Sequence, residues 1–201
     1  VVGVVEGRDI VTLEGVGFSD REAGRVMDPR IARIRWASVG KSFAPVVALR
    51  HGDQLDLDVD IQQYFPGYIV PDGYLGGRCR TPECASPLTE PQRRITLRQL
   101  FSHRAGIQHY SNGVSSPEPP LELINDPVVN TGMEWALSYF INHPLVAIPG
   151  TATSYSTFGF NLGGVVLESV LENDFESLVL EHVAYRLGMN TLQADRYWLD
   201  I

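Results

Sequence analysis

The sequence predicts an α+β fold in which strands come first and helices follow. Residues 1–36 are rich in β-branched residues, which favour strands. From residue 38 onward, apolar residues recur at the spacing of helices. With 201 residues, 44% of them hydrophobic, the chain can bury one sizeable core. We therefore expect a single domain over residues 1–201, with sheet strands in 1–36 and a helical part in 37–201.

Three strands are expected in the first part of the chain. Residues 1–6 and 10–18 read as two strands on either side of the turn Gly7-Arg8-Asp9. Residues 31–36 alternate apolar with polar or small side chains and predict a third strand that runs into a helix. So few strands make a small sheet for a chain of this length.

The stretch Ser38-Val39-Gly40-Lys41 is the centre of the functional prediction. We expect a helix from Ser38 to about His51, on which positions i and i+3 share a face, so that the Ser38 hydroxyl and the Lys41 amine can meet. Serine is a weak nucleophile until an adjacent base activates it, and a lysine kept neutral by burial or nearby cations can be that base. Unpaired N–H groups at the helix start suit a developing negative charge.

This stretch has two other interpretations. A serine and a lysine at this spacing more often mark a solvated helix face. Here the apolar residues that follow repeat at helical spacing and predict a buried helix; they are Val39, Phe43, Val46 and Val47. Gly40-Lys41-Ser42 also resembles the end of a phosphate-binding loop. That loop needs a glycine five residues before the Gly-Lys pair, and Arg35 stands there.

The region after this stretch is expected to be kinked, then extended, then irregular. Pro45 removes a backbone hydrogen bond and is expected to kink the helix. Residues 55–61 alternate strictly and predict an extended, half-buried segment. Their aspartates do not fit a calcium loop, since Ile61 and Gly67 stand where glycine and glutamate are required. Residues 66–91 predict a loop.

Two helices are expected in the next part of the chain. Thr96 can cap a short helix that carries Leu97, Leu100 and Phe101. His103 follows it, and we interpret this histidine as bracing a loop rather than as catalytic. The capping box Thr131-Gly132-Met133-Glu134 predicts a second helix, which ends at Pro144.

Two more helices complete the prediction. The turn Pro149-Gly150-Thr151 precedes a helix over residues 160–171, in which Gly163 and Gly164 allow close packing. Asp174 can cap a last helix that stops at Gly188 and places His182 in the core or at its rim.

Composition excludes several classes of partner. The chain has 16 basic and 24 acidic residues, a net charge of −8, which argues against a nucleic-acid partner. No apolar run is long enough for a membrane span. No cysteine–histidine set has metal-ligand spacing, and we expect no metal or cofactor. Cys79 and Cys84 fit either a local disulfide or two free thiols.

Three motifs in fixed order resemble one family. They are Ser38-Val39-Gly40-Lys41, residues 95–107, and Pro149-Gly150-Thr151 followed by residues 155–160. Together they span nearly the whole chain and resemble the class C β-lactamase-related serine hydrolases, a group with penicillin-binding proteins, D-aminopeptidases and carboxylesterases. Within it, the Tyr-Ser-Thr-Phe-Gly of residues 155–159 is most similar to the mitochondrial serine β-lactamase-like protein and its bacterial relatives.

The resemblance implies a β-lactamase/transpeptidase-like fold, an antiparallel sheet with an inserted helical lobe. It implies that Ser38 is the acylated nucleophile, that Lys41 helps to take its proton and that Tyr155 is the second acid/base group. The family's oxyanion hole would use the backbone N–H of Ser38 and one from a late strand.

Three departures from the family pattern matter. Thr157 stands where the family's Tyr-x-Asn has asparagine, so we expect Thr157 to contact substrate and recognition to differ. Tyr110-Ser111-Asn112 matches Tyr-x-Asn, but only Tyr155 has the Pro-Gly-Thr lead and the following helix, and we prefer Tyr155. The family's late Lys- or His-x-Gly does not occur. We therefore expect an N-terminal portion of a longer protein that is nearly inactive in isolation.

Two functions follow from these patterns. The first is a serine hydrolase that cleaves an amide or ester of a small molecule or peptide through an acyl-enzyme on Ser38. The alternative is a catalytically silent scaffold or binding protein. The resemblance leaves homo-oligomerisation open, and it implies a periplasmic, secreted or mitochondrial location.

Overall fold

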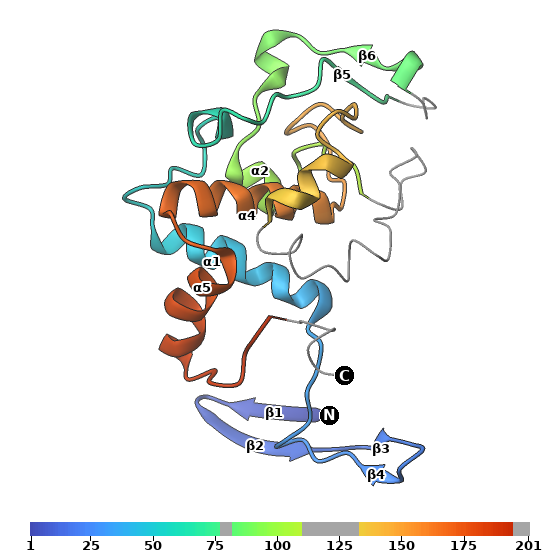
Figure 1. The fold of residues 1–201 in the computed structure, drawn as a ribbon, viewed down its shortest axis with the longest axis vertical. Coiled ribbons are helices and arrows are strands. Elements are labelled where there is room, and N and C mark those ends of the chain that lie inside the picture. The colour runs from blue at the N-terminus through green and yellow to red at the C-terminus, as the bar shows by residue number, and fades with distance from the viewer. Residues whose placement is uncertain (77–81, 110–132, 195–201) are drawn as a thin grey trace. The chain divides into compact units, whose positions relative to one another are not determined.

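The structure, a computed structural model, describes residues 1–76, 82–109 and 133–194. The chain divides into two compact units, Val1–Ser38 and Val39–Ile201. The first unit contains strands and no described α-helix, whereas the second is mainly helical (Figure 1). This order of elements agrees with the α+β prediction.

A hairpin begins the first unit. Strand β1 (Val2–Glu6) pairs antiparallel with β2 (Asp9–Glu14), from Val2 opposite Glu14 to Glu6 opposite Asp9. Gly7 in the connecting turn has a φ of +63°, which glycine adopts without steric cost. The predicted turn between two strands is therefore confirmed.

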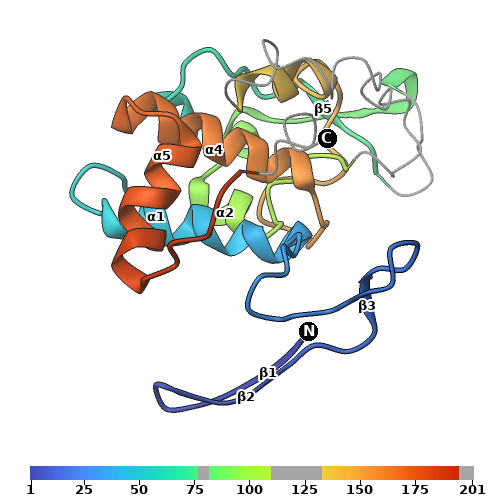
Figure 2. The same cartoon turned by 60° about the horizontal axis from the view of Figure 1, so that its bottom comes forward.

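A second, shorter hairpin follows along the blue end of the chain (Figure 2). Strand β3 (Phe18–Asp20) pairs antiparallel with β4 (Arg25–Val26). The predicted strand over 10–18 is thus wrong in its extent, because it ends at Glu14 and Phe18 belongs to a different pair. Gly17, with a φ of +78°, lies in the break between the two strands.

The predicted strand over residues 31–36 is wrong. The Ile31 N–H donates to the Asp28 carbonyl in a turn, and residues 32–36 form no regular element. A strand needs a neighbouring backbone to complete its hydrogen bonds. No strand among the described residues pairs with this segment, and the alternation of residue types alone does not supply a partner.

The helix expected from Ser38 to His51 is present in two forms. The 3-10 helix η1 (Ala37–Ser42) leads into the α-helix α1 (Phe43–Arg50), whose C-cap is His51. Pro45 is the third residue of α1, where a backbone N–H has no partner within an α-helix. The α-helix starts only two residues before Pro45, and the kink predicted there stays a prediction.

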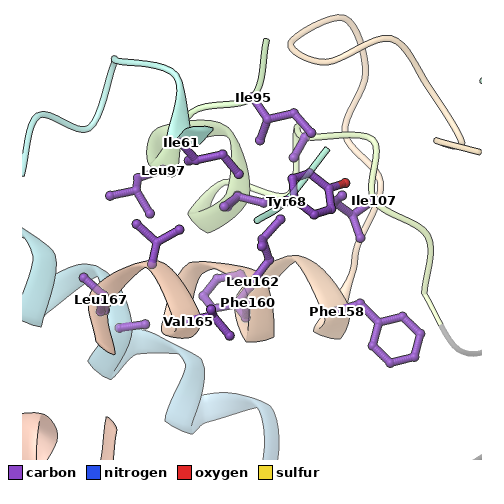
Figure 3. Packing of buried hydrophobic residues seen from close by; sticks show 14 of the residues in the cluster. Ile61, Tyr68, Ile95, Leu97, Ile107, Phe158, Phe160, Leu162, Val165 and Leu167 are labelled. Atoms are coloured by element: carbon purple, nitrogen blue, oxygen red, sulfur yellow. The ribbon is translucent and has the colours of Figure 1, made fainter. Parts of the chain in front are cut away.

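The core of the second unit is organised around helix α4 (Thr157–Leu171). This helix contacts α1, α2, α5 and η5, and Figure 1 shows it in the middle of the unit. Its buried side chains meet others from segments far away in the sequence (Figure 3). Those labelled in Figure 3 are the buried residues Ile61, Tyr68, Ile95, Leu97 and Ile107.

Two adjacent glycines let α4 approach its neighbours closely. A Cβ built at Gly163 would collide with the Phe101 ring, and one at Gly164 would lie 2.9 Å from the Met133 Cε. The close packing predicted for this pair is confirmed. The helix itself starts at Thr157, three residues earlier than predicted.

Helices α2 (Leu97–Phe101) and α5 (Phe175–Val179) begin where their capping residues predict. The Thr96 hydroxyl accepts from the Gln99 N–H, and the Gln99 side chain accepts from the Thr96 N–H, which completes a capping box. The Asp174 carboxylate accepts from the Ser177 N–H at 2.9 Å. The π-helical turn η6 (Leu180–Ala184) and the 3-10 turn η7 (Tyr185–Leu187) continue α5 until Gly188 ends it.

The segments between α1 and α2 contain only short elements. Residues 55–61 keep their alternating burial but include a turn, and Asp60 forms an isolated antiparallel bridge with Thr96. The extended segment predicted there is therefore wrong in part. The predicted loop 66–91 contains a small antiparallel pair and short 3-10 turns: β5 (Gly73–Tyr74), β6 (Ser86–Pro87), η3 (Pro82–Cys84) and η4 (Glu90–Arg93), after η2 (Ile61–Gln63).

The helix predicted after Met133 is a 3-10 helix, η5 (Glu134–Tyr139), not an α-helix. Thr131 of its predicted capping box lies outside the described residues. Cys84 is disulfide-bonded, and Cys79 lies outside the described residues. In the described part of the chain, no helix is long and apolar enough to cross a membrane. The same residues hold no group of three or more potential metal ligands.

Candidate active site

Lys41 and Tyr155, which are distant in the sequence, lie together in the second unit. The Lys41 Nζ is 5.2 Å from the centroid of the Tyr155 ring and 6.0 Å from that of Phe160. A lysine ammonium at such a distance is attracted by the face of an aromatic ring. Lys41 is half-buried, whereas Tyr155 is 44% exposed. The site therefore joins a basic group and a phenol that is exposed to solvent.

Ser38 lies on the same short helix as Lys41. Both belong to η1, and residues three apart on a 3-10 helix are eclipsed on one side. Ser38 is exposed and is the last residue of the first unit. Ala37, directly before it, has a φ of +44°, which is strained for a residue with a Cβ. The backbone is thus strained next to the predicted nucleophile.

Tyr155 belongs to a segment that is hydrogen-bonded to the loop after α2. We call residues 103–109 and 150–157 together the clasp. Within it, the Gly150 N–H donates to the Arg104 carbonyl at 2.7 Å, and the Ser154 N–H donates to the His103 carbonyl at 2.8 Å. The Arg104 guanidinium also donates to the Gly150 carbonyl. These bonds fix the chain before and after the turn that leads to Tyr155.

Ser156 links the clasp to the start of α4. Its hydroxyl donates to the Gln108 carbonyl at 2.6 Å and accepts from the Gly159 N–H at 2.9 Å, so that it is the N-cap of the helix. Both residues are buried, and the Gln108 side-chain amide has no hydrogen-bond partner. The N-terminus of α4 is therefore anchored next to Tyr155.

His103 braces the clasp, as predicted from the sequence. Its Nδ1 accepts the Ser156 N–H at 3.1 Å, and its ring centroid lies 4.3 Å from that of Tyr155. Its φ of +58° is left-handed, which is uncommon for a residue other than glycine. Backbone and ring together place this imidazole against the tyrosine.

His109 is a second imidazole at the same place, and the sequence analysis missed it. Its Nδ1 accepts the Thr157 N–H at 3.3 Å, and its ring meets Tyr155 edge-on at 5.2 Å. The available signal was its position at the end of the loop that carries His103. Its partner lies 48 residues further along the chain, which no local pattern reveals.

Burial and a nearby cation lower the pKa of both histidines. Burial is the larger cause of the lowered pKa of His103, followed by the charge of Lys41. The pKa of His109 is lowered by burial, then by Lys41 and then by His103. Each imidazole is therefore neutral near pH 7.

The remaining predicted site residues have different outcomes. Thr157 is half-buried in the first turn of α4, two residues after Tyr155, and its backbone N–H is bonded to His109. The competing motif Tyr110-Ser111-Asn112 lies outside the described residues. The structure thus brings Lys41 and Tyr155 together, with Thr157 beside the tyrosine in sequence, and places Ser38 on the helix of Lys41.

Comparison with known families gives this arrangement a context. Residues 1–196 match the family model described as Beta-lactamase. The chain belongs to the beta-lactamase family. The predicted resemblance is therefore confirmed.

Curated relatives of this beta-lactamase-family chain match over its larger part. The human "Serine beta-lactamase-like protein LACTB, mitochondrial" is 31% identical over 117 residues, which is 57% of this chain and 18% of the human protein. The bovine protein of the same name is 32% identical over 113 residues, which is 55% of this chain and 17% of that protein. The match thus spans less than a fifth of the length of either relative.

Solved structures of similar fold support the α+β prediction. EstCE1, "a hydrolase with promiscuous acyltransferase activity", is 24% identical with a TM-score of 0.62 over 90% of this chain and 44% of its own. The D-amino acid amidase from Ochrobactrum anthropi is 19% identical with a TM-score of 0.66, over 92% of this chain and 44% of its own. The penicillin binding protein from Bacillus halodurans is 22% identical with a TM-score of 0.62, over 90% of this chain and 46% of its own. The predicted β-lactamase/transpeptidase-like fold is confirmed.

Proposed function

We propose that this chain carries the nucleophile side of a serine hydrolase that cleaves an amide or an ester through an acyl-enzyme on Ser38. The observation that carries the proposal is the 5.2 Å approach of the Lys41 Nζ to the Tyr155 ring. A serine hydrolase needs a base for its nucleophile and a proton source for its leaving group. Lysine and tyrosine can fill these two roles when they lie beside the serine.

Each residue has a defined role in this proposal. The Ser38 Oγ attacks the carbonyl carbon while Lys41, which acts here in its neutral form, takes the hydroxyl proton, and this gives a tetrahedral oxyanion. The oxyanion collapses to the acyl-enzyme as Tyr155 gives a proton to the leaving amine or alcohol. Water then attacks the acyl carbonyl as the Tyr155 phenolate takes a proton from it. The ester bond to Ser38 breaks as Lys41 returns its proton to the Ser38 Oγ, which restores the hydroxyl.

Substrate class is supported by the similar structures and by Thr157. Similar proteins are described as a hydrolase with promiscuous acyltransferase activity, a D-amino acid amidase and a D-stereospecific amidohydrolase. Thr157 offers a hydroxyl two residues after Tyr155, and we expect it to hydrogen-bond the substrate. A hydroxyl is shorter than an amide, so the preferred substrate brings its own polar group closer to α4.

Covalent labelling tests the proposal. The full-length protein is treated with a fluorophosphonate, a fluorescent penicillin or an activated ester, and the label is followed on a denaturing gel. Labelling is expected for the wild-type protein and is lost in Ser38→Ala. Ser42→Ala is the matched control, since Ser42 lies on the same helix and its hydroxyl donates to the Val39 carbonyl. Equal labelling of Ser38→Ala and the wild-type protein would show that another group reacts.

A catalytically silent scaffold is the second candidate. It is favoured by Thr157, which stands where the family pattern has an asparagine. A similar structure, 20% identical with a TM-score of 0.63, is described as an octameric penicillin-binding protein homologue from Pyrococcus abyssi. Light scattering that finds a defined oligomer, together with no labelling by any of the three reagents in a folded protein, supports the scaffold.

A further inference from the structure

His103 and His109 hold the two backbone amides that follow Tyr155. The Ser156 N–H donates to the Nδ1 of His103 at 3.1 Å, and the Thr157 N–H donates to the Nδ1 of His109 at 3.3 Å. Two consecutive peptide groups are therefore each bonded to a different imidazole. These two amides belong to the N-cap and the first residue of α4, directly after Tyr155.

The same two rings also contact the Tyr155 side chain. The His103 ring is tilted by 33° to the phenol with centroids 4.3 Å apart, and the His109 ring meets it at 83° with centroids 5.2 Å apart. One imidazole thus covers the phenol ring while the other contacts it edge-on. Offset and edge-to-face contacts of this kind stabilise one ring orientation.

Both hydrogen bonds require a neutral imidazole. A ring nitrogen that accepts an N–H has its lone pair in the bond and cannot carry a proton. Each neutral ring must then bear its proton on Nε2. Protonation of Nδ1 would set one N–H against another, so the bond would break.

The surroundings favour the neutral form of both rings. The amides they accept are at the N-terminus of the 15-residue helix α4, the positive end of its dipole. Among the residues that the structure describes, the charged and titratable groups near them are Lys41 from η1, Tyr155 and the other imidazole. The pKa of each histidine is lowered by burial and then by Lys41. A second positive charge is therefore unfavourable beside Lys41.

We propose that His103 and His109 are positioning residues that hold Tyr155 only while both imidazoles are neutral, so that mild acid switches the site off. The proposal rests on the proposed function for its effect on turnover, because Tyr155 is there the acid/base group. The hold on Tyr155 itself does not depend on that function and can be measured without substrate.

Nitrogen NMR tests the hold directly. In full-length protein labelled with ¹⁵N-histidine, long-range ¹H–¹⁵N spectra are expected to show unprotonated Nδ1 and protonated Nε2 for both residues near neutral pH. On acidification, the Ser156 and Thr157 amide protons are expected to shift together with the imidazole signals, with midpoints below the ordinary histidine value of about 6.5. A proton on Nδ1 of either ring near neutral pH overturns the proposal.

Asparagine and leucine variants separate positioning from general packing. The Oδ1 of asparagine lies where the Nδ1 of histidine lies and accepts an N–H, but it does not titrate. His103→Asn and His109→Asn are expected to label more than about tenfold faster than the matching leucine variants, since leucine leaves a backbone amide unpaired. The double variant with both asparagines is also expected to lose much of the decline in labelling rate between about pH 7.5 and pH 5.5, because each single variant keeps one histidine that titrates. His143→Asn, in the loop after η5, is the control and should keep the wild-type pH profile.

The outcomes distinguish this proposal from the proposed function. If Ser38→Ala labels like the wild-type protein while the NMR tautomers and the linked amide shifts are as expected, the function is wrong and the hold stands. If labelling needs Ser38 but asparagine and leucine behave alike, the positioning role is wrong and the function stands.

Discussion

Two pairs of histidines in the second unit show how different partners give the same side chain different roles. His103 and His109 each accept a backbone N–H and contact Tyr155. His51 and His182 contact each other instead, edge-on at 4.4 Å, and the buried Nε2 of His51 has no hydrogen-bond partner. The first pair is tied to the backbone of a site, whereas the second fills space between α1 and η6. Chemistry is therefore expected to depend on the first pair and only stability on the second.

The largest effect is expected at the tyrosine that the first pair contacts. Tyr155→Phe removes the phenol proton and is expected to lower kcat of the full-length protein by about 100-fold or more, the usual contribution of an acid/base group. Tyr110→Phe, the matched control, is expected to change kcat by less than about threefold, because it is not the acid/base group. Steady-state kinetics on an activated ester measure both. The opposite ranking would mean that Tyr110 is the catalytic tyrosine.

A smaller effect, on the free energy of unfolding, is expected when the helix N-cap close to each histidine pair is removed. Ser156→Ala deletes a buried hydroxyl with two bonds and is expected to lower the free energy of unfolding by about 2 kcal/mol. Asp174→Ala deletes the exposed cap of α5, the helix that leads to His182, and is expected to cost about 1 kcal/mol. Urea denaturation of both variants measures the difference. If Asp174→Ala lowers the free energy of unfolding as much as Ser156→Ala or more, the cap next to Tyr155 is not the stronger of the two.

The smallest effect is expected from titration of His182 in the second pair. The pKa of His182 is lowered, mainly by burial and then by His51, with Arg186 and Arg50 also lowering it and Glu181 raising it. The folded chain therefore binds fewer protons at this residue than the unfolded chain, and its contribution to stability falls as the pH drops through about 6.5 toward the lowered value. His182→Gln is expected to flatten slightly the fall of Tm between pH 7.5 and pH 5, without changing the pH profile of labelling. A changed labelling profile would place this pair in the site as well.

The features of this fold that could be predicted are those that depend on residues close together in the sequence. Thr96 and Asp174 cap their helices through bonds to residues three positions later, so the sequence at each end was sufficient. Gly163 and Gly164 also correctly predicted close packing of helix α4 against its neighbours. The Pro-Gly-Thr turn before Tyr155 belongs to the same class, because Gly150 has a φ of +82°.

The parts that failed depend on contacts far along the chain. Residues 31–36 look like a strand, but a strand needs a partner that alternation does not specify. The 3-10 form of η1 could not be read from residues that equally suit an α-helix. The role of His109 rests on a backbone amide 48 residues away, so only the folded chain reveals it.

Site-resolved mapping of a covalent adduct tests the central claim most directly. The full-length protein is reacted with a fluorophosphonate, digested, and each modified residue is identified by tandem mass spectrometry. We predict one adduct, on Ser38, whose formation slows in both Lys41→Ala and Tyr155→Phe. An adduct on Ser42 or another residue, or labelling of Ser38 that is indifferent to both variants, would contradict it.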